Sequence, residues 1–165
     1  MPAIYAAISE DERRNVLIFD DVLKAVEAGR SPIVLTERRD HLDYLQGRFS
    51  RFVRNLAVLR GGMSAADRKG MESALHVSDD QERLILATGR YIGEGFDDKR
   101  LDTLFLTMPI SWKGTLAQYV GRLHREHARK NDVLVVDYCD EGVPVLARMA
   151  AKRRVGYRSL GYTLE

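Results

Sequence analysis

The chain has 165 residues, of which 45% are hydrophobic and 30% charged, with a formal net charge of +2. This composition is typical of a soluble globular domain, and no apolar run approaches the roughly 20 residues that a membrane-spanning helix needs. The single cysteine, Cys139, excludes a disulfide framework, and residues 1–10 do not resemble an export signal, so we expect one cytoplasmic domain.

The N-terminal third predicts a long helix followed by a βα unit. Ser9 and Glu12 form a capping-box pattern, and Gly29 ends the apolar periodicity, which predicts a helix within residues 1–30. Residues 32–36 then predict a buried strand, and residues 39–49 predict a helix with its apolar side facing inward.

The rest of the chain repeats this alternation. Residues 56–59 predict a second strand that ends at Gly61-Gly62, and Ser64 can cap the helix that follows. Further strands are expected at 83–87, 103–107 and 133–136, with helices at about 115–127 and 143–154. Residues 142–165 form a C-terminal helical extension of the same domain. The alternation predicts an α/β fold with a mostly parallel sheet and helices on both faces.

Residues 115–127 predict a helix with two distinct sides. Gln118, Arg122 and Arg125 fall on one side at spacings i, i+4 and i+7, opposite an apolar side formed by Leu116, Tyr119, Val120 and Leu123. Arginine stays charged and binds phosphate oxygens in a bidentate manner, so this side is suited to an anion. A solvated face of an amphipathic helix is the alternative interpretation.

A glycine-rich turn follows the strand at 83–87. Thr88 and Gly89 are followed by Arg90 and then by Glu94-Gly95-Phe96-Asp97. Such turns occur where α/β sheets bind ligands, because glycine allows close backbone approach, threonine can donate to phosphate and aspartate can accept from a sugar hydroxyl. An ordinary strand-to-helix turn is the alternative.

Four segments share the order and spacing of a known family. Ile33 to Thr36, Leu59 to Ser64, Ala87 to Asp97 and Gln118-x-x-Gly121-Arg122-x-x-Arg125 resemble motifs of the C-terminal RecA-like domain of superfamily 2 helicases, closest to the Res-subunit-like DEAD/DEAH group. Gly89-Arg90-Tyr91 and Leu123-His124 depart from the usual residues, without removing either arginine. The resemblance covers roughly residues 30–138 and implies a RecA-like three-layer sandwich.

The resemblance also implies roles for individual residues. Arg122 and Arg125, with Gln118, act on the γ-phosphate of ATP as catalytic groups, and Glu94, Gly95 and Asp97 contact the nucleotide. The implied contacts to nucleic acid, with DNA favoured over RNA, are Thr36, Gly61, Gly62, Thr88, Gly89 and Arg90. Charge builds up on the γ-phosphate in the transition state, so an arginine supplied across a cleft accelerates hydrolysis by orders of magnitude.

The sequence lacks the other half of an ATP site. It contains neither a G-x-x-x-x-G-K-[ST] loop (Walker A) nor an Asp-Glu-x-His or Asp-Glu-Ala-Asp box (Walker B), so this chain alone should bind neither ATP nor Mg²⁺ and should not hydrolyse ATP. We expect both cofactors in a longer motor with an N-terminal RecA-like lobe. The alternative is a catalytically inert helicase-like module that binds nucleic acid or protein. A free-standing Rossmann-like enzyme is disfavoured, because the turn Thr36 to Arg39 lacks glycine.

Several other polar and aromatic residues have a plausible structural role. His124 and His127 lack further ligands at zinc-like spacing, so packing or phosphate-facing roles are favoured over a metal site. Solvated loop carboxylates are favoured for Asp137, Asp140 and Glu141. Trp112 suits a helix-start packing contact or base stacking. Residues 113–165 contain 10 Lys/Arg against 6 Asp/Glu, and four basic residues of the last helix fit either phosphate contacts or a solvated face: Arg148, Lys152, Arg153 and Arg154.

Overall fold

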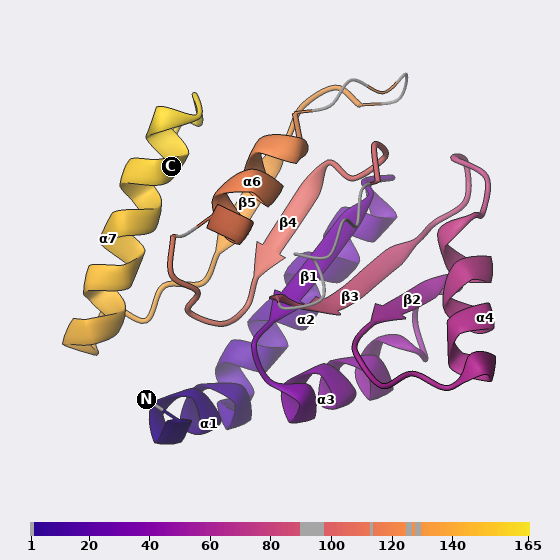
Figure 1. Cartoon of the computed structure of the whole chain (residues 1–165), viewed down its shortest axis with the longest axis horizontal. Coiled ribbons are helices and arrows are strands. Elements are labelled where there is room, and N and C mark those ends of the chain that lie inside the picture. Colours follow the sequence, from indigo (N-terminus) through magenta and orange to yellow (C-terminus); the bar gives the residue numbers. More distant parts are fainter. Residues whose placement is uncertain (1, 90–97, 113, 125–126, 128–129) are drawn as a thin grey trace.

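The computed structural model describes residues 2–89, 98–112, 114–124, 127 and 130–165, with backbone alone for Pro2, Thr115 and Arg122. Its centre is a five-stranded, wholly parallel sheet in the order β2-β3-β1-β4-β5 (Figure 1). The strands are β1 (Pro32–Thr36), β2 (Leu56–Leu59), β3 (Leu84–Thr88), β4 (Thr103–Leu106) and β5 (Leu134–Asp137). The predicted α/β class with a mostly parallel sheet is confirmed.

Described helices cover both faces of the sheet, whereas the N-terminal helix packs beside Met108 and Leu146 (Figure 1). The described helices are α1 (Pro2–Glu10), α2 (Glu12–Glu27), α3 (Arg39–Phe49), α4 (Ala65–Leu75), α6 (Gly114–Arg122) and α7 (Pro144–Ser159). None of these helices combines the length and the apolar character that a membrane crossing requires.

Alternating strand residues build two separate cores. In β1, Ile33 and Leu35 point to the face covered by α4 and α6, whereas Val34 points to the face covered by α2 and α3. The side chains of all three residues are at most 2% exposed. A strand that is buried on both faces needs apolar residues at every position, which explains the continuous apolar run from Ile33 to Leu35.

The N-terminal segment differs from the single long helix that was expected. It forms α1 and α2, and Asp11, rather than Ser9, caps α2 by accepting a hydrogen bond from the backbone N–H of Arg14. Ser9 instead donates its hydroxyl to the carbonyl oxygen of Ala6 within α1. An extended residue at Asp11 allows α1 to change direction and pack Ile8 against Met108 and Leu146.

A buried ion pair attaches α7 to the sheet. Arg153 is 1% exposed and donates to both carboxylate oxygens of Asp137, at 2.7 and 3.0 Å, and the Tyr157 hydroxyl donates to the same carboxylate at 2.8 Å. The interpretation of Asp137 as a solvated carboxylate is therefore wrong, because its side chain does not face solvent. For the same reason Arg153 neither contacts a phosphate nor lies on a solvated face. Asp140 is likewise paired, with Arg14 at 3.1 Å. Glu141 is solvated as expected and pairs with the partly exposed Arg154.

Candidate functional site

The described residues with a predicted nucleic-acid role gather at the carboxyl edge of the sheet. Thr36 and Thr88 end adjacent strands and lie opposite each other in the register of β1 and β3. Gly61 and Gly62 follow β2, the next strand along, and are exposed; Gly62 has φ of +70°, a backbone conformation that favours glycine. The fold therefore brings these residues from separate segments to one edge, while their contacts with nucleic acid remain a prediction.

The Thr36 side chain lies beneath this edge rather than on it. It is 0% exposed, and its Oγ1 is 2.9 Å from Nδ1 of His41. The other ring nitrogen of His41 lies 2.9 Å from Oδ1 of Asn15, whose amide donates to the Ser9 carbonyl oxygen. This chain of polar contacts ties β1 to α2 and α3. A contact between the Thr36 hydroxyl and a ligand would require the hydrogen bond with His41 to open.

The environment of His41 makes a pH-dependent contribution to stability. Burial, followed by the positive charge of Arg14, lowers the pKa of His41 from 6.5 to about 4. The unfolded chain therefore binds a proton that the folded chain does not, and the stability present above pH 6.5 is lost as pH falls toward 4. Between pH 7.5 and pH 5, wild type should lose about 2 kcal/mol more than His41→Asn in urea unfolding. Equal losses in both proteins would contradict this assignment.

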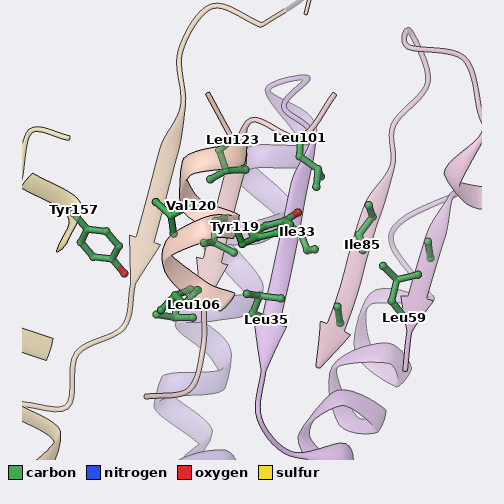
Figure 2. Close-up of a cluster of buried hydrophobic side chains, with 14 residues drawn as sticks. Ile33, Leu35, Leu59, Ile85, Leu101, Leu106, Tyr119, Val120, Leu123 and Tyr157 are labelled. Atoms are coloured by element: carbon green, nitrogen blue, oxygen red, sulfur yellow. The ribbon is translucent and has the colours of Figure 1, made fainter. Parts of the chain in front are cut away.

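Helix α6 presents the two sides that its sequence predicts. Leu116, Tyr119, Val120 and Leu123 are at most 5% exposed and pack on the sheet over β1 and β4, as Figure 2 shows for the last three. Gln118 is exposed. Arg122 is the last residue of α6, and its side chain lies outside the described set. The burial of the apolar side fixes the rotation of α6, so the face that carries Gln118 points away from the sheet.

The carboxyl end of α6 lies at the opposite, amino edge of the sheet. Lys130, a few residues before β5, donates to the carbonyl oxygen of Leu123 at 2.8 Å. Asp98 pairs at 2.7 Å with Arg83, directly before β3. Asp98, which follows the predicted segment Glu94 to Asp97, and Leu123, which follows Arg122, therefore lie at the same edge.

Several predicted site residues lie outside the described residues. They are Arg90, Glu94, Gly95, Asp97 and Arg125. Gly89 is described, and a Cβ atom at this position would overlap the carboxylate of Glu37, which follows β1. The roles of all these residues, and of Arg122, stay predictions.

The remaining candidates make packing contacts. Trp112 meets Tyr157 edge to face at 5.2 Å and lies directly against Gly156, which favours the packing interpretation over base stacking. His124 packs against Tyr162 at 4.9 Å, and His127 lies 3.1 Å from Asp79. Across the described residues, no group of three His, Cys, Asp or Glu side chains could hold a metal ion.

Sequence reasoning missed the polar residues that join distant elements. His41, Asn15 and Arg14 connect α2 to the ends of β1, β4 and β5. The one sequence signal for such residues is a polar side chain on the inward, otherwise apolar side of a predicted helix, because a buried polar group needs a hydrogen-bond partner. That signal identifies the residue but not its partner.

Comparisons with known proteins find proteins of similar sequence and of similar fold. No protein-family model matches the chain. The chain is 26% identical over 121 residues to transcript termination protein A18 of vaccinia virus (strain Ankara), covering 72% of this chain. It is 27% identical over the same length to transcript termination protein A18 of cowpox virus (strain Brighton Red). It spans about a quarter (24%) of the length of these viral relatives.

Two solved structures share the architecture. The structure of T4 UvsW matches 97% of this chain with a TM-score of 0.75 and 16% sequence identity, and the chain covers 35% of it. The C-terminal part of the Fun30 ATPase domain matches 90% with a TM-score of 0.61 and 13% identity, and the chain covers 48% of it. With the parallel sheet and its two helical layers, these likenesses identify the fold as an α/β, RecA-like fold.

Proposed function

We propose that this chain is the second RecA-like lobe of an ATP-driven nucleic-acid helicase or translocase. Its role is to supply Arg122 and Arg125, assisted by Gln118, to ATP and Mg²⁺ held by a first lobe. The observation that carries the proposal is the placement of α6: its apolar side is buried on a helicase-like RecA sheet and its Gln118 side is exposed. In a helix, positions i+4 and i+7 from Gln118 fall on its own side, so we expect Arg122 and Arg125 there; Arg122 is the last residue of α6, and Arg125 lies beyond the helix.

The comparisons support this role at a coarse level. One similar structure is part of an ATPase domain, and the curated relatives are transcript termination proteins about four times as long as the matched segment. A longer relative leaves room for a first lobe that binds the phosphates. The bordering contacts at Asp98 and Leu123 support a common nucleotide-facing edge.

The described residues with a proposed contact to nucleic acid lie at the other edge. Thr88, Gly89 and Arg90, with the turn at Gly61 and Gly62, would bind the phosphate backbone of one strand. Opening and closing of the cleft between the two lobes would then couple ATP turnover to movement along that strand. DNA is the favoured substrate, and we place the activity in the cytoplasm.

ATP hydrolysis by two proteins tests the proposal. The isolated 165-residue chain should show no turnover, whereas the longest native polypeptide that contains it should hydrolyse ATP and be stimulated several-fold by single-stranded DNA or RNA. Titrating both nucleic acids separates the two substrates. A native polypeptide that binds nucleic acid but never turns over ATP would show instead an inert binding module.

A further inference from the structure

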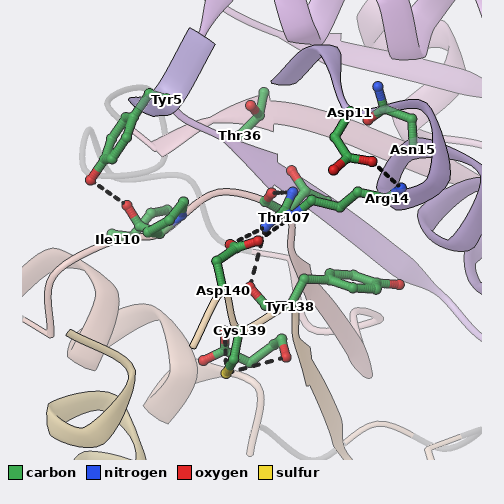
Figure 3. Close-up of polar contacts among 12 residues, drawn as sticks. Tyr5, Asp11, Arg14, Asn15, Thr36, Thr107, Ile110, Tyr138, Cys139 and Asp140 are labelled. Atoms are coloured by element: carbon green, nitrogen blue, oxygen red, sulfur yellow. Dashed lines mark hydrogen bonds and ion pairs between the residues drawn. The ribbon is translucent and has the colours of Figure 1, made fainter. Parts of the chain in front are cut away.

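The loop between β4 and α6 accepts hydrogen bonds from three helices that are far away in the chain. Arg14 of α2 donates through Nη1 to the Thr107 carbonyl oxygen, and Tyr5 of α1 donates its hydroxyl to the Pro109 carbonyl oxygen at 2.9 Å. The third donor is Nη1 of Arg153 in α7, 3.0 Å from the carbonyl oxygen of Ile110. Figure 3 shows Tyr5 and Arg14 approaching this loop from α1 and α2.

Both arginines are themselves held by carboxylates at the end of β5. Arg14 donates Nε and Nη2 to the two oxygens of Asp140, each at 3.1 Å, and Arg153 binds Asp137 in the same bidentate manner. The arginine side chains are 9% and 1% exposed. Each guanidinium therefore keeps a fixed plane, with Nη1 aimed at a loop carbonyl.

The loop is fixed from its other side as well. The Thr107 hydroxyl donates to the Leu35 carbonyl oxygen at 2.6 Å, and Met108 is 1% exposed against α1 and α7. Trp112, two residues before α6 begins at Gly114, lies in contact with Gly156 of α7. A loop held at Thr107, Pro109 and Ile110 leaves α6 little freedom in where it starts.

We propose that Tyr5, Arg14 and Arg153 are positioning residues for α6. By holding the carbonyl oxygens of the β4–α6 loop, they set the place from which Arg122 and Arg125 reach a nucleotide. The inference rests on the proposed function for its consequence in catalysis. In this geometry α1, α2 and α7 each contribute one hydrogen-bond donor to the same loop.

The test removes the hydroxyl group of Tyr5 and keeps its aromatic ring. Tyr5→Phe removes the bond to Pro109, and Tyr138→Phe is the matched control, because the hydroxyl of Tyr138 is also partly buried but donates to Asp21 of α2 at 2.8 Å. In the 165-residue chain, amide hydrogen exchange of α6 should become about tenfold faster in Tyr5→Phe, with α3 unchanged. In Tyr138→Phe, the amide exchange rate of α6 should change no more than that of α3.

The kinetics of ATP hydrolysis provide a second measurement. In the longest native polypeptide, Tyr5→Phe should lower kcat for ATP about tenfold with KM unchanged, because misplaced arginines weaken the transition state more than they weaken ATP binding. Arg14→Lys keeps a cation beside Asp140 but cannot span the same partners, and it should act in the same direction.

Equal acceleration of exchange in α6 and α3, or equal effects of Tyr5→Phe and Tyr138→Phe on α6, would overturn the proposal. If wild type shows no ATP turnover, the proposed function fails, while hydrogen exchange still decides whether the three donors position α6.

Discussion

In the longest native polypeptide that contains this chain, Arg125→Ala should lower kcat for nucleic-acid-stimulated ATP hydrolysis about 10³-fold. The guanidinium is expected to bind charge that develops on the γ-phosphate in the transition state, so kcat should fall far more than the affinity for ATP. Arg122→Ala should act in the same direction. Steady-state ATPase rates at saturating single-stranded nucleic acid measure both effects.

An exposed arginine on another helix provides the control for this experiment. Arg68 of α4 is exposed and lies outside the proposed site, so Arg68→Ala should retain the wild-type rate. Circular dichroism of each variant checks that the fold is intact. An Arg125→Ala protein that hydrolyses ATP at the wild-type rate would exclude the proposed role of this residue.

The largest loss of stability should come from the ion pair that holds α7. Arg153→Met leaves the Asp137 carboxylate with a buried charge that has lost both of its arginine hydrogen bonds, which costs about 3 to 5 kcal/mol of unfolding free energy. Globular domains have roughly 5 to 15 kcal/mol in total, so the variant should lose a large fraction of its stability. Urea unfolding at neutral pH measures the difference.

The neighbouring arginine offers a matched comparison. Arg154 pairs with Glu141 at 3.2 Å, but both side chains are at least a third exposed, so Arg154→Met should cost no more than about 1 kcal/mol. Adding Asp137→Asn to Arg153→Met should restore part of the lost stability, because it removes the uncompensated charge. Arg153→Met and Arg154→Met with equal midpoints and slopes would refute the assignment of a buried, stabilising pair.

Periodicity predicted β1 and α6 well because each has a clear apolar signature. β1 is apolar at Ile33, Val34 and Leu35 because it is the central strand with helices on both faces, and α6 shows its buried side through Leu116, Tyr119 and Val120. Such signals depend on near neighbours in the chain. The sequence therefore predicted the fold class and the rotation of α6.

Contacts between distant residues could not be predicted in the same way. Asp137 and Arg153 lie in segments that both appear solvated, and only the docking of α7 on β5 shows that each buries the other. At the N-terminus, Ser9 and Asp11 are both suitable helix caps, and the packing of Ile8 against Met108 and Leu146 coincides with the helix beginning after Asp11. Partner choice depends on the assembled fold in both cases.

The affinity of the longest native polypeptide that contains this chain for a transition-state mimic tests the central claim most directly. With nucleic acid bound, the wild-type protein should bind ADP with aluminium fluoride at least about 100-fold more tightly than the Arg122→Ala/Arg125→Ala double variant, whereas ADP alone should bind both proteins equally. Equal affinity of the two proteins for the mimic would contradict the claim that this lobe supplies arginines to the ATP site.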